Sequence, residues 1–372
     1  MKIAMIGHKR IPSREGGVEI VVQELSTRLA AKGHDVCVYN RGGHHVSGSE
    51  YDYSEKLHEY QGVRIKTVLT INKKGLAAMT SSMFATIRTL FGHYDVIHYH
   101  AEGPCAMLWL PHLFGIRTVA TIHGLDWQRA KWGGFAVKYL KLGEKTAAKY
   151  ADEVVVLSEN VRRYFKDTYG RKTAFIPNGV SEPQIREADV IRKKWGLKKD
   201  SYILFLGRIV PEKGIHYLID VYRTLETDKR LVIAGGASDT DTYMAGLKAK
   251  ATGEDRILFT GFVQGEPLEE LYANAYLYVL PSDLEGMPLS LLEAMSYGNC
   301  CLVSDIPECA EVVEDQAATF RKGDVADLRD KLAELIRNPD TVQAYKKNAA
   351  TFVCGKYSWD TVVSETLALY QI

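Results

Sequence analysis

Short apolar runs alternate with helical patterns along the whole chain, and this alternation restricts the fold more than any other feature of the sequence. Residues 2–6 and 117–122 have the length and composition of buried strands, whereas residues 18–32 place apolar side chains at helical spacing and stop at Gly33. Strands that alternate with helices predict a parallel sheet covered by helices on both faces. The plan is repeated in the second half, with strands over 202–206, 231–234, 257–260, 276–280 and 300–303. We therefore predict two doubly wound, Rossmann-like α/β domains facing each other across a ligand-binding cleft.

The length of 372 residues exceeds what one ordinary core accommodates, which also favours two domains. The charged, irregular segment 180–200 is the expected linker. The formal net charge is only +1, so the composition gives no indication of nucleic-acid binding.

The sequence also indicates the compartment. It contains no apolar run of about 18 residues or more, which a spanning helix requires, and its N-terminus does not have the pattern of a signal peptide. None of the six cysteines lies in a CxxC pair, and Cys37, Cys300 and Cys301 fall in apolar, strand-like runs. Buried, reduced thiols and a cytoplasmic protein are therefore expected.

The stretch PSDLEGMPLSLLEAM, residues 281–295, follows a predicted strand and runs into a helix that we expect to start at Pro288. The free N–H groups at a helix start bind anions, and Gly286 leaves room for a ligand to approach. Glu285 and Glu293 frame this start, and their carboxylates can accept hydrogen bonds from hydroxyls. The alternative is that Glu285 caps the helix and Glu293 lies on the surface.

The glycine pattern separates classes of nucleotide-binding protein. There is no GxGxxG after a first strand and no GxxxxGK[ST], so dinucleotide binding and P-loop hydrolysis are disfavoured. Instead, Gly16 and Gly17 precede the first helix. They either leave a bare helix N-terminus for an anion or simply make a turn.

Two cations follow the first strand of the second half. Arg208 and Lys213 stand five residues apart, a spacing with which a bidentate guanidinium and a mobile ammonium can hold a diphosphate. The alternative is a pair of ordinary surface cations. Their position at the carboxyl end of a strand in the same sheet as the 281–295 stretch favours the diphosphate site.

Histidines at two strand ends are further candidates. His123 ends the strand 117–122 and precedes Gly124, which would let a ligand come close. His98 and His100 alternate along another strand, but the sequence offers no convincing third ligand, so we predict no metal site.

Taken together, these motifs resemble a retaining glycosyltransferase of family 4 with the GT-B fold, and the resemblance covers nearly the whole chain. It is carried by Gly16-Gly17, Thr121-Ile122-His123-Gly124, Pro177-Asn178-Gly179-Val180, Gly207-Arg208 with Lys213-Gly214, and Glu285–x7–Glu293. The opening residues 8–19 are similar to a bacterial subgroup that contains rhamnosyltransferases of surface polysaccharide assembly. The resemblance implies an acceptor-side domain over 1–180, a nucleotide-sugar domain over 181–356, and a last helix within 357–372 that crosses back to the first domain.

The resemblance also implies a function. The chain would be a hexosyltransferase-type enzyme that moves a sugar from a nucleoside diphosphate sugar to a glycan or lipid-linked acceptor, with retention and with no metal or other cofactor. The implied catalytic residues are His123, Arg208, Lys213 and Glu285. The implied donor-binding residues are Gly16, Gly17, Arg208, Lys213, Val263, Glu285, Gly286, Met287, Pro288, Leu289, Ser290 and Glu293.

Within that set the roles differ. Arg208 and Lys213 would hold the diphosphate, Glu293 would bind the ribose hydroxyls and Glu285 would contact the hydroxyls of the sugar. His123 would lie against the donor sugar, Val263 beside the nucleobase, and Gly17 would approach the phosphate. A GT-B epimerase would need its own acid–base carboxylates and no acceptor, and a binding protein would not need the intact set of charged residues. Release of nucleoside diphosphate separates these alternatives.

Residues 131–150 predict an amphipathic helix in the first domain. Its lysines form a single stripe, with Ala136, Leu140 and Ala147 on the opposite face. The stripe consists of Lys131, Lys138, Lys141, Lys145 and Lys149. Two interpretations stay open, namely a solvated helix face and a patch that binds anionic lipid headgroups at the inner face of the membrane.

Overall fold

The computed structural model describes residues 1–43, 57–71, 73, 75–129, 132–237 and 240–371, which form two compact units. The first unit comprises Met1–Asn178 with Trp359–Ile372, and the second comprises Gly179–Ser358. The last helix of the chain thus belongs to the first unit.

The first unit is built on one sheet, and among the described residues it has the strand order β3-β4-β2-β1-β5-β6-β7-β8. The strands are β1 (Lys2–Ile6), β2 (Asp35–Arg41), β3 (Glu59–Tyr60), β4 (Val63–Val68), β5 (Val96–His100), β6 (Arg117–Ile122), β7 (Glu153–Val156) and β8 (Ala174–Phe175). Neighbouring strands are parallel except β3 and β4, which are antiparallel. The order reverses between β1 and β5, so the topological switch point lies there.

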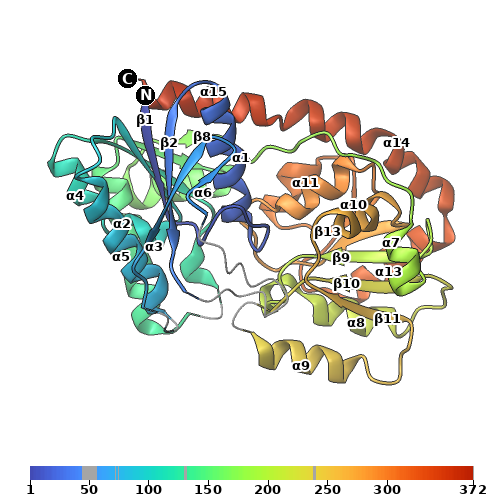
Figure 1. The fold of residues 1–372 in the computed structure, drawn as a ribbon. Coiled ribbons are helices and arrows are strands. Elements are labelled where there is room, and N and C mark those ends of the chain that lie inside the picture. Colours follow the sequence, from blue (N-terminus) through green and yellow to red (C-terminus); the bar gives the residue numbers. More distant parts are fainter. Residues whose placement is uncertain (44–56, 72, 74, 130–131, 238–239, 372) are drawn as a thin grey trace. The chain divides into compact units, whose positions relative to one another are not determined.

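Helices cover both faces of this sheet, as buried parallel strands require. They are α1 (Gly17–Ala31), α2 (Leu76–Thr89), α3 (Glu102–Cys105), α4 (Trp109–Leu113), α5 (Gly134–Tyr150), α6 (Glu159–Tyr169) and α15 (Trp359–Tyr370), with a 3-10 turn η2 at Asp126–Gln128. In Figure 1, α1 and α15 lie together on one side of the sheet, and α2, α3 and α5 lie on the other. Fully buried strand residues, among them Ala4, Ile97 and Ala120, form the core between these layers.

The second unit has a sheet of parallel strands in the order β11-β10-β9-β12-β13-β14. The strands are β9 (Tyr202–Leu206), β10 (Arg230–Ala234), β11 (Ile257–Gly261), β12 (Leu277–Leu280), β13 (Cys301–Ser304) and β14 (Ala318–Phe320). The switch point lies between β9 and β12, the two strands that precede the predicted diphosphate site and the 281–295 stretch.

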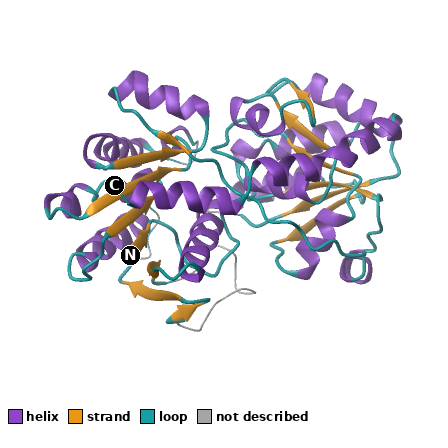
Figure 2. Cartoon of the chain, turned by 90° about the horizontal axis from the view of Figure 1, so that it is seen from above, coloured by secondary structure: helices purple, strands orange, loops and turns teal. Residues whose placement is uncertain are grey.

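Helices flank this sheet as well, and Figure 2 shows strands between layers of helices in each unit. They are α7 (Val190–Trp195), α8 (Ile215–Tyr222), α9 (Asp241–Lys250), α10 (Glu266–Ala273), α11 (Leu289–Ser296), α12 (Pro307–Val313), α13 (Val325–Arg337) and α14 (Pro339–Lys356), with a 3-10 turn η3 at Pro211–Lys213. The prediction of mixed α/β architecture with two doubly wound parallel sheets is confirmed. Each cysteine is free, and Cys37, Cys300 and Cys301 are buried, as expected.

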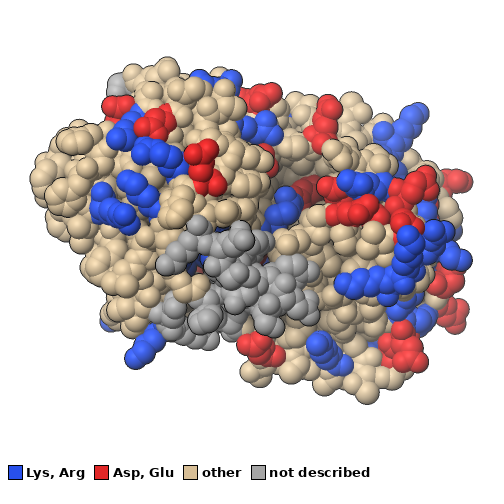
Figure 3. Space-filling model, viewed as in Figure 1, with Lys and Arg blue, Asp and Glu red and all other residues tan. Residues whose placement is uncertain are grey.

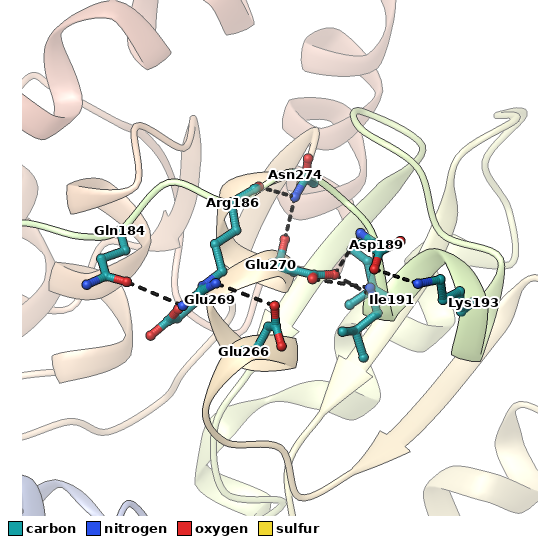
Figure 4. Close-up of polar contacts among 10 residues, drawn as sticks. Gln184, Arg186, Asp189, Ile191, Lys193, Glu266, Glu269, Glu270 and Asn274 are labelled. Atoms are coloured by element: carbon teal, nitrogen blue, oxygen red, sulfur yellow. Dashed lines mark hydrogen bonds and ion pairs between the residues drawn. The ribbon is translucent and has the colours of Figure 1, made fainter.

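The segment 180–200 is irregular over residues 181–187, as the sequence suggested, but it is not irregular throughout. It contains α7, which packs against α10 within the second unit (Figure 4). The buried carboxylate of Glu270 accepts the backbone N–H groups of Asp189 at 3.0 Å and Ile191 at 3.0 Å. These are N–H groups at the start of α7, which have no acceptor within their own helix, so a side chain from another helix caps α7.

We expect Glu270→Gln to destabilise the second unit by about 2–3 kcal/mol, since it replaces a charged acceptor of backbone N–H groups by a neutral amide. Urea unfolding followed by tryptophan fluorescence and circular dichroism measures the change. Glu269→Gln is the matched control, because Glu269 pairs with Arg186 at the surface, and a pair of that kind contributes about 0–1 kcal/mol. Equal stability of wild type and Glu270→Gln would contradict the capping role.

Candidate active site

The predicted site residues of the second unit gather at the carboxyl edge of its sheet, around the switch point between β9 and β12. Gly207 and Arg208 directly follow β9, and the loop 281–288 directly follows β12. Because the carboxyl ends of parallel strands meet at one edge, the two segments become neighbours.

Gly214 explains how closely these two loops approach each other. Its φ is +65°, in the left-handed region, and a Cβ at this position would lie 2.0 Å from the carbonyl oxygen of Pro281. The backbone N–H of Asp283 also donates to the carbonyl of Glu212 at 2.8 Å. Glycine is therefore required at position 214, and the contact that it allows carries Lys213 to the loop after β12.

Lys213 and Glu285 form an ion pair, with 2.6 Å between Nζ and Oε1. Their side chains are only 11% and 8% exposed, so little solvent screens the pair. The hydroxyl of Ser282 donates to the same carboxylate oxygen at 2.6 Å. The structure thus brings together two residues for which the resemblance implies separate roles. Ser282, which holds the carboxylate of Glu285, was missed by the sequence analysis.

Helix α11 begins at Leu289, one residue later than expected, and Pro288 precedes it with an extended ψ of 102°. The first N–H groups of a helix have no acceptor within it and lie at the positive end of its dipole. Gly286 and Met287 are buried just before this helix start. A helix therefore starts close to where the sequence predicted it, and anion binding there stays a prediction.

Glu293 lies in the second turn of α11 and is partly buried. The hydroxyl of Tyr272 donates to its Oε2 at 3.1 Å. Tyr278 similarly donates to the Oγ of Ser290 at 2.9 Å, and burial raises the pKa of Tyr278 well above its ordinary value, so its phenol keeps the proton. Two tyrosines that the sequence analysis missed therefore fix two predicted donor-binding residues. Nothing in their local sequence indicates this role.

The two remaining predicted residues of the second unit lie at the same edge of the sheet. Arg208 is partly buried after β9. Val263 follows β11 and is 8% exposed. Their positions are compatible with the roles implied by the resemblance.

In the first unit, Gly16 and Gly17 stand at the start of α1, as predicted, but that helix start is not bare. The carboxylate of Glu19 folds back onto it: a Cβ on Gly16 would lie 2.4 Å from Oε2, and Oε1 accepts the backbone N–H of Lys9 at 2.9 Å. Burial opposes the ionisation of Glu19, but Lys9 and Arg41 outweigh it and hold its pKa below the ordinary value. An anion at Gly17 would therefore have to displace or neutralise this carboxylate.

His123 follows β6 and is one of three neighbouring imidazoles. His98 and His100 lie on β5, with their rings stacked at a centroid distance of 4.2 Å, and Nδ1 of His100 lies 3.1 Å from Nε2 of His123. Burial lowers the pKa of His123 to about 4 and that of His98 to about 3, so both rings are neutral at pH 7. Across the described residues, no group of three or more His, Cys, Asp or Glu side chains has a geometry that could hold a metal ion.

The predicted basic helix is α5, which begins at Gly134. Lys131 lies outside the described residues. Lys138, Lys145 and Lys149 are exposed. Lys141 is also exposed, but its ammonium lies over the ring of Trp127, 4.1 Å from the centroid. The lysine stripe therefore exists on the described part of α5, with one member packed on an aromatic ring.

The opposite face of α5 is buried, as its small and apolar residues predict. It also contains Glu144, which has no exposed surface and accepts hydrogen bonds from Trp127 (3.0 Å), Tyr164 (2.8 Å) and Tyr169. Glu144 thereby anchors η2, the turn that follows His123 and Gly124.

Comparison with known proteins connects these elements to a family. Residues 15–182 match the model described as Glycosyltransferase Family 4, and residues 187–352 match that of Glycosyl transferases group 1. The first match includes the glycine pair and His123, and the second includes all the predicted site residues of the second unit.

Individual relatives agree with the family models. An uncharacterised glycosyltransferase of Methanocaldococcus jannaschii is 26% identical over 100% of this chain and 98% of its own length. The Escherichia coli enzyme UDP-Gal:alpha-D-GlcNAc-diphosphoundecaprenol alpha-1,3-galactosyltransferase is 29% identical over 57% of this chain and 58% of its own length.

Two solved structures have the same fold. Sucrose-phosphate synthase from Thermosynechococcus elongatus superposes with a TM-score of 0.84 at 22% identity, covering 100% of this chain and 98% of that chain. HepE of Anabaena, solved with UDP-glucose, gives 0.80 at 18% identity and covers 99% of both chains. The two doubly wound sheets and these likenesses show the GT-B fold, and the two family matches identify the chain as a glycosyltransferase enzyme of the family 4 type.

Proposed function

We propose that this enzyme transfers a hexosyl group from a nucleoside diphosphate sugar to an acceptor hydroxyl with retention of the anomeric configuration. The observation that carries the proposal is the Lys213–Glu285 ion pair at the switch point of the second unit, beside Arg208 and the start of α11. Cations and helix N–H groups suit the diphosphate, and the carboxylates of Glu285 and Glu293 suit sugar and ribose hydroxyls. The HepE complex with UDP-glucose shows that a protein of this fold holds such a donor.

The proposed mechanism follows from the charges that develop in the transition state of sugar transfer. As the bond between the sugar and the diphosphate breaks, negative charge grows on the leaving diphosphate and positive charge on the sugar. Arg208, Lys213 and the first N–H groups of α11 would stabilise the leaving group, because they are already oriented and partly shielded from water. A leaving phosphate oxygen would accept the proton of the acceptor hydroxyl on the same face of the sugar.

The donor base is tested by thermal shifts with UDP, GDP and dTDP. A ligand at about 100 times its dissociation constant stabilises the folded state by about 2.7 kcal/mol. We expect one of these three nucleotides to raise the melting temperature of the wild-type enzyme. The same nucleotide should not raise the melting temperature of Glu293→Gln. If none of them shifts the wild type at millimolar concentration, the proposed donor site is wrong.

For the acceptor, we propose a lipid-linked glycan in the assembly of a bacterial surface polysaccharide, such as capsule, O-antigen or exopolysaccharide. The diphosphoundecaprenol-linked acceptor in the name of the Escherichia coli relative supports the acceptor class. Rhamnose is the proposed sugar, because residues 8–19 are similar to the rhamnosyltransferase subgroup.

We expect the activity to survive EDTA, because Arg208 and Lys213 supply the positive charge that a metal ion would otherwise bring to the diphosphate. Initial rates with and without EDTA test this expectation. Loss of activity in EDTA with recovery on addition of Mg²⁺ or Mn²⁺ would contradict it.

We further propose that the first unit contacts the membrane through α5 and its neighbour α4. On α5, Phe135 and Leu142 are 75% and 53% exposed, and they interleave at helical spacing with Lys138, Lys145 and Lys149. Exposed aromatic and aliphatic side chains beside lysines suit the headgroup region of an anionic bilayer.

Helix α4 extends this surface, since it packs against α5. Leu113 is 69% exposed and Phe114, which directly follows α4, is 67% exposed. The part of the surface over α4, at the left of Figure 3, shows neither basic nor acidic side chains. Within the described ranges, no helix is long and apolar enough to cross a membrane. The contact that we propose is a peripheral one.

The membrane contact predicts salt-sensitive binding to phosphatidylglycerol vesicles in a sedimentation assay. Replacing Lys138, Lys145 and Lys149 with Glu should weaken binding by about 3 kcal/mol or more, roughly a hundredfold, at about 1 kcal/mol per lysine near the surface. Lys141 is left in place, because it packs on Trp127.

The matched control replaces three exposed lysines of the second unit with Glu, so that the change in net charge is the same. These lysines are Lys248, Lys322 and Lys347. Donor affinity should be unchanged in both triple variants. If wild type does not sediment with anionic vesicles at low salt, or if both triple variants lose binding equally, the α4–α5 surface is only solvated.

A further inference from the structure

A chain of buried polar contacts runs from the last helix of the sequence to His123, entirely within the first unit. The hydroxyl of Tyr370 on α15 lies 2.6 Å from Nδ1 of His98. The ring of His98 stacks on that of His100, whose Nδ1 lies 3.1 Å from Nε2 of His123. His98 and His100 are 1% and 0% exposed, so bulk solvent does not reach their rings.

The contacts of His98 determine which of its nitrogens carries the proton. Its Nδ1 faces the hydroxyl of Tyr370, and its Nε2 faces Oγ1 of Thr121 at 2.7 Å. If the hydroxyl of Tyr370 instead accepted a hydrogen bond from Nδ1, its own hydrogen could not be donated to His98. A buried hydroxyl hydrogen without an acceptor is costly. Tyr370 therefore donates to Nδ1, and the proton of His98 is on Nε2, where it donates to Thr121.

The same reasoning applies to His100 and His123. Nε2 of His100 is buried and has no hydrogen-bond partner among the described residues, so a proton there would be an unpaired donor. A bare, unpaired acceptor is better tolerated than an unpaired N–H group. His100 therefore carries its proton on Nδ1 and donates to Nε2 of His123. Since His123 is neutral, its own proton must be on Nδ1.

We propose that His100 is a positioning residue that holds His123 in the Nδ1–H tautomer, with His98 and Tyr370 of α15 fixing the ring of His100. The proposal rests on the role proposed for His123 beside the donor sugar. His123 is partly exposed, whereas His98 and His100 are buried. In this tautomer His123 would donate a ring N–H to a sugar hydroxyl or a phosphate oxygen and would not offer it an unprotonated nitrogen. Tyr370 thus acts directly on His98, and His100 is the residue that contacts His123.

The tautomers are read from the full-length protein labelled with ¹⁵N-histidine, by long-range ¹H–¹⁵N correlation spectra at pH 7. Single His→Gln variants assign the three rings. In wild type we expect His123 and His100 as Nδ1–H and His98 as Nε2–H. An Nε2–H tautomer or a mixture at His123 overturns the proposal, and because this measurement needs no turnover, its failure is distinct from failure of the proposed function.

Two variants test the chain of contacts. His100→Phe keeps a ring but removes the donor, so His123 should lose its fixed tautomer. We expect kcat to fall about 10–100-fold, a loss of the size that follows removal of the partner that orients a metal-binding histidine. The affinity for nucleoside diphosphate should stay the same. Tyr370→Phe should change the ¹⁵N signals of His98 and leave His123 in the Nδ1–H form.

His58→Phe is the matched control, because His58 is exposed and distant in sequence from the three rings. It should change neither the signals of His123 nor kcat. If His100→Phe folds, by circular dichroism, and leaves the tautomer of His123 unchanged, the positioning role is refuted. If His100→Phe does not fold, the ¹H–¹⁵N spectrum of the wild type alone tests the proposal, through the tautomer of His123.

Discussion

Arg208→Ala is expected to lower kcat by about 10²–10³ with little change in melting temperature, because it removes one charged partner of the leaving diphosphate in the transition state. Arg208→Lys should recover only part of the loss, since an ammonium cannot make the bidentate contact of a guanidinium. Steady-state rates with the donor identified by thermal shift measure both. Full activity of Arg208→Ala would remove Arg208 from the site.

Lys213→Ala should reduce kcat to a similar extent and should also destabilise the protein, which the motif alone does not suggest. Removing one partner of a buried ion pair costs about 3–5 kcal/mol, because the other charge stays buried. Here the hydroxyl of Ser282 still donates to Glu285 and should keep the cost near the lower value.

A double variant separates the catalytic effect of Lys213 from its structural effect. Lys213→Met with Glu285→Gln removes both charges and keeps the two side-chain volumes close to the originals. We expect it to recover most of the lost melting temperature and none of the lost turnover. Recovery of activity together with stability would mean that Lys213 serves only to hold Glu285.

Glu293→Gln is expected to weaken the binding of free nucleoside diphosphate itself. A charge-assisted hydrogen bond contributes about 1.5–3 kcal/mol, which corresponds to roughly 10–150-fold in Kd. Tyr272→Phe should have a smaller effect of the same sign, because it leaves the carboxylate but removes the hydroxyl that orients it. Calorimetric titration measures all these affinities.

Glu285→Gln should behave differently, because its carboxylate contacts Lys213 and, in the proposed complex, the sugar. Free nucleoside diphosphate should bind as tightly as to wild type, or more tightly, since Lys213 is released for the phosphates. Turnover should nevertheless fall. Equal loss of nucleoside diphosphate affinity in Glu285→Gln and Glu293→Gln would contradict this division of roles.

Much of the fold and part of the site could be predicted from local sequence. The apolar runs placed the main strands within one or two residues, and Pro288 with the following leucines placed α11 within one residue. These features depend on short-range periodicity and on helix-start residues, which a single sequence contains. Short elements such as β14 and α7 were missed, because three to six residues carry too little periodicity to be recognised.

Contacts between distant residues could not be predicted. The Lys213–Glu285 pair joins residues 72 positions apart and depends on Gly214 lying against Pro281. Similarly, His100 meets His123 because β5 and β6 are neighbours in register, with His100 opposite Thr121. From the sequence alone, His98 and His100 could only be considered as possible metal ligands. In the fold they contact Tyr370, Thr121 and His123 instead.

The most direct test of the central claim is the release of nucleoside diphosphate from a panel of nucleotide sugars, measured with and without a lipid-linked glycan acceptor. The account predicts release from one donor, dependent on the acceptor, with the sugar recovered on the acceptor in its original anomeric configuration. The Lys213→Met, Glu285→Gln double variant should release none above background. Conversion of the nucleotide sugar without an acceptor, or tight binding of a donor with no release under any condition, would contradict it.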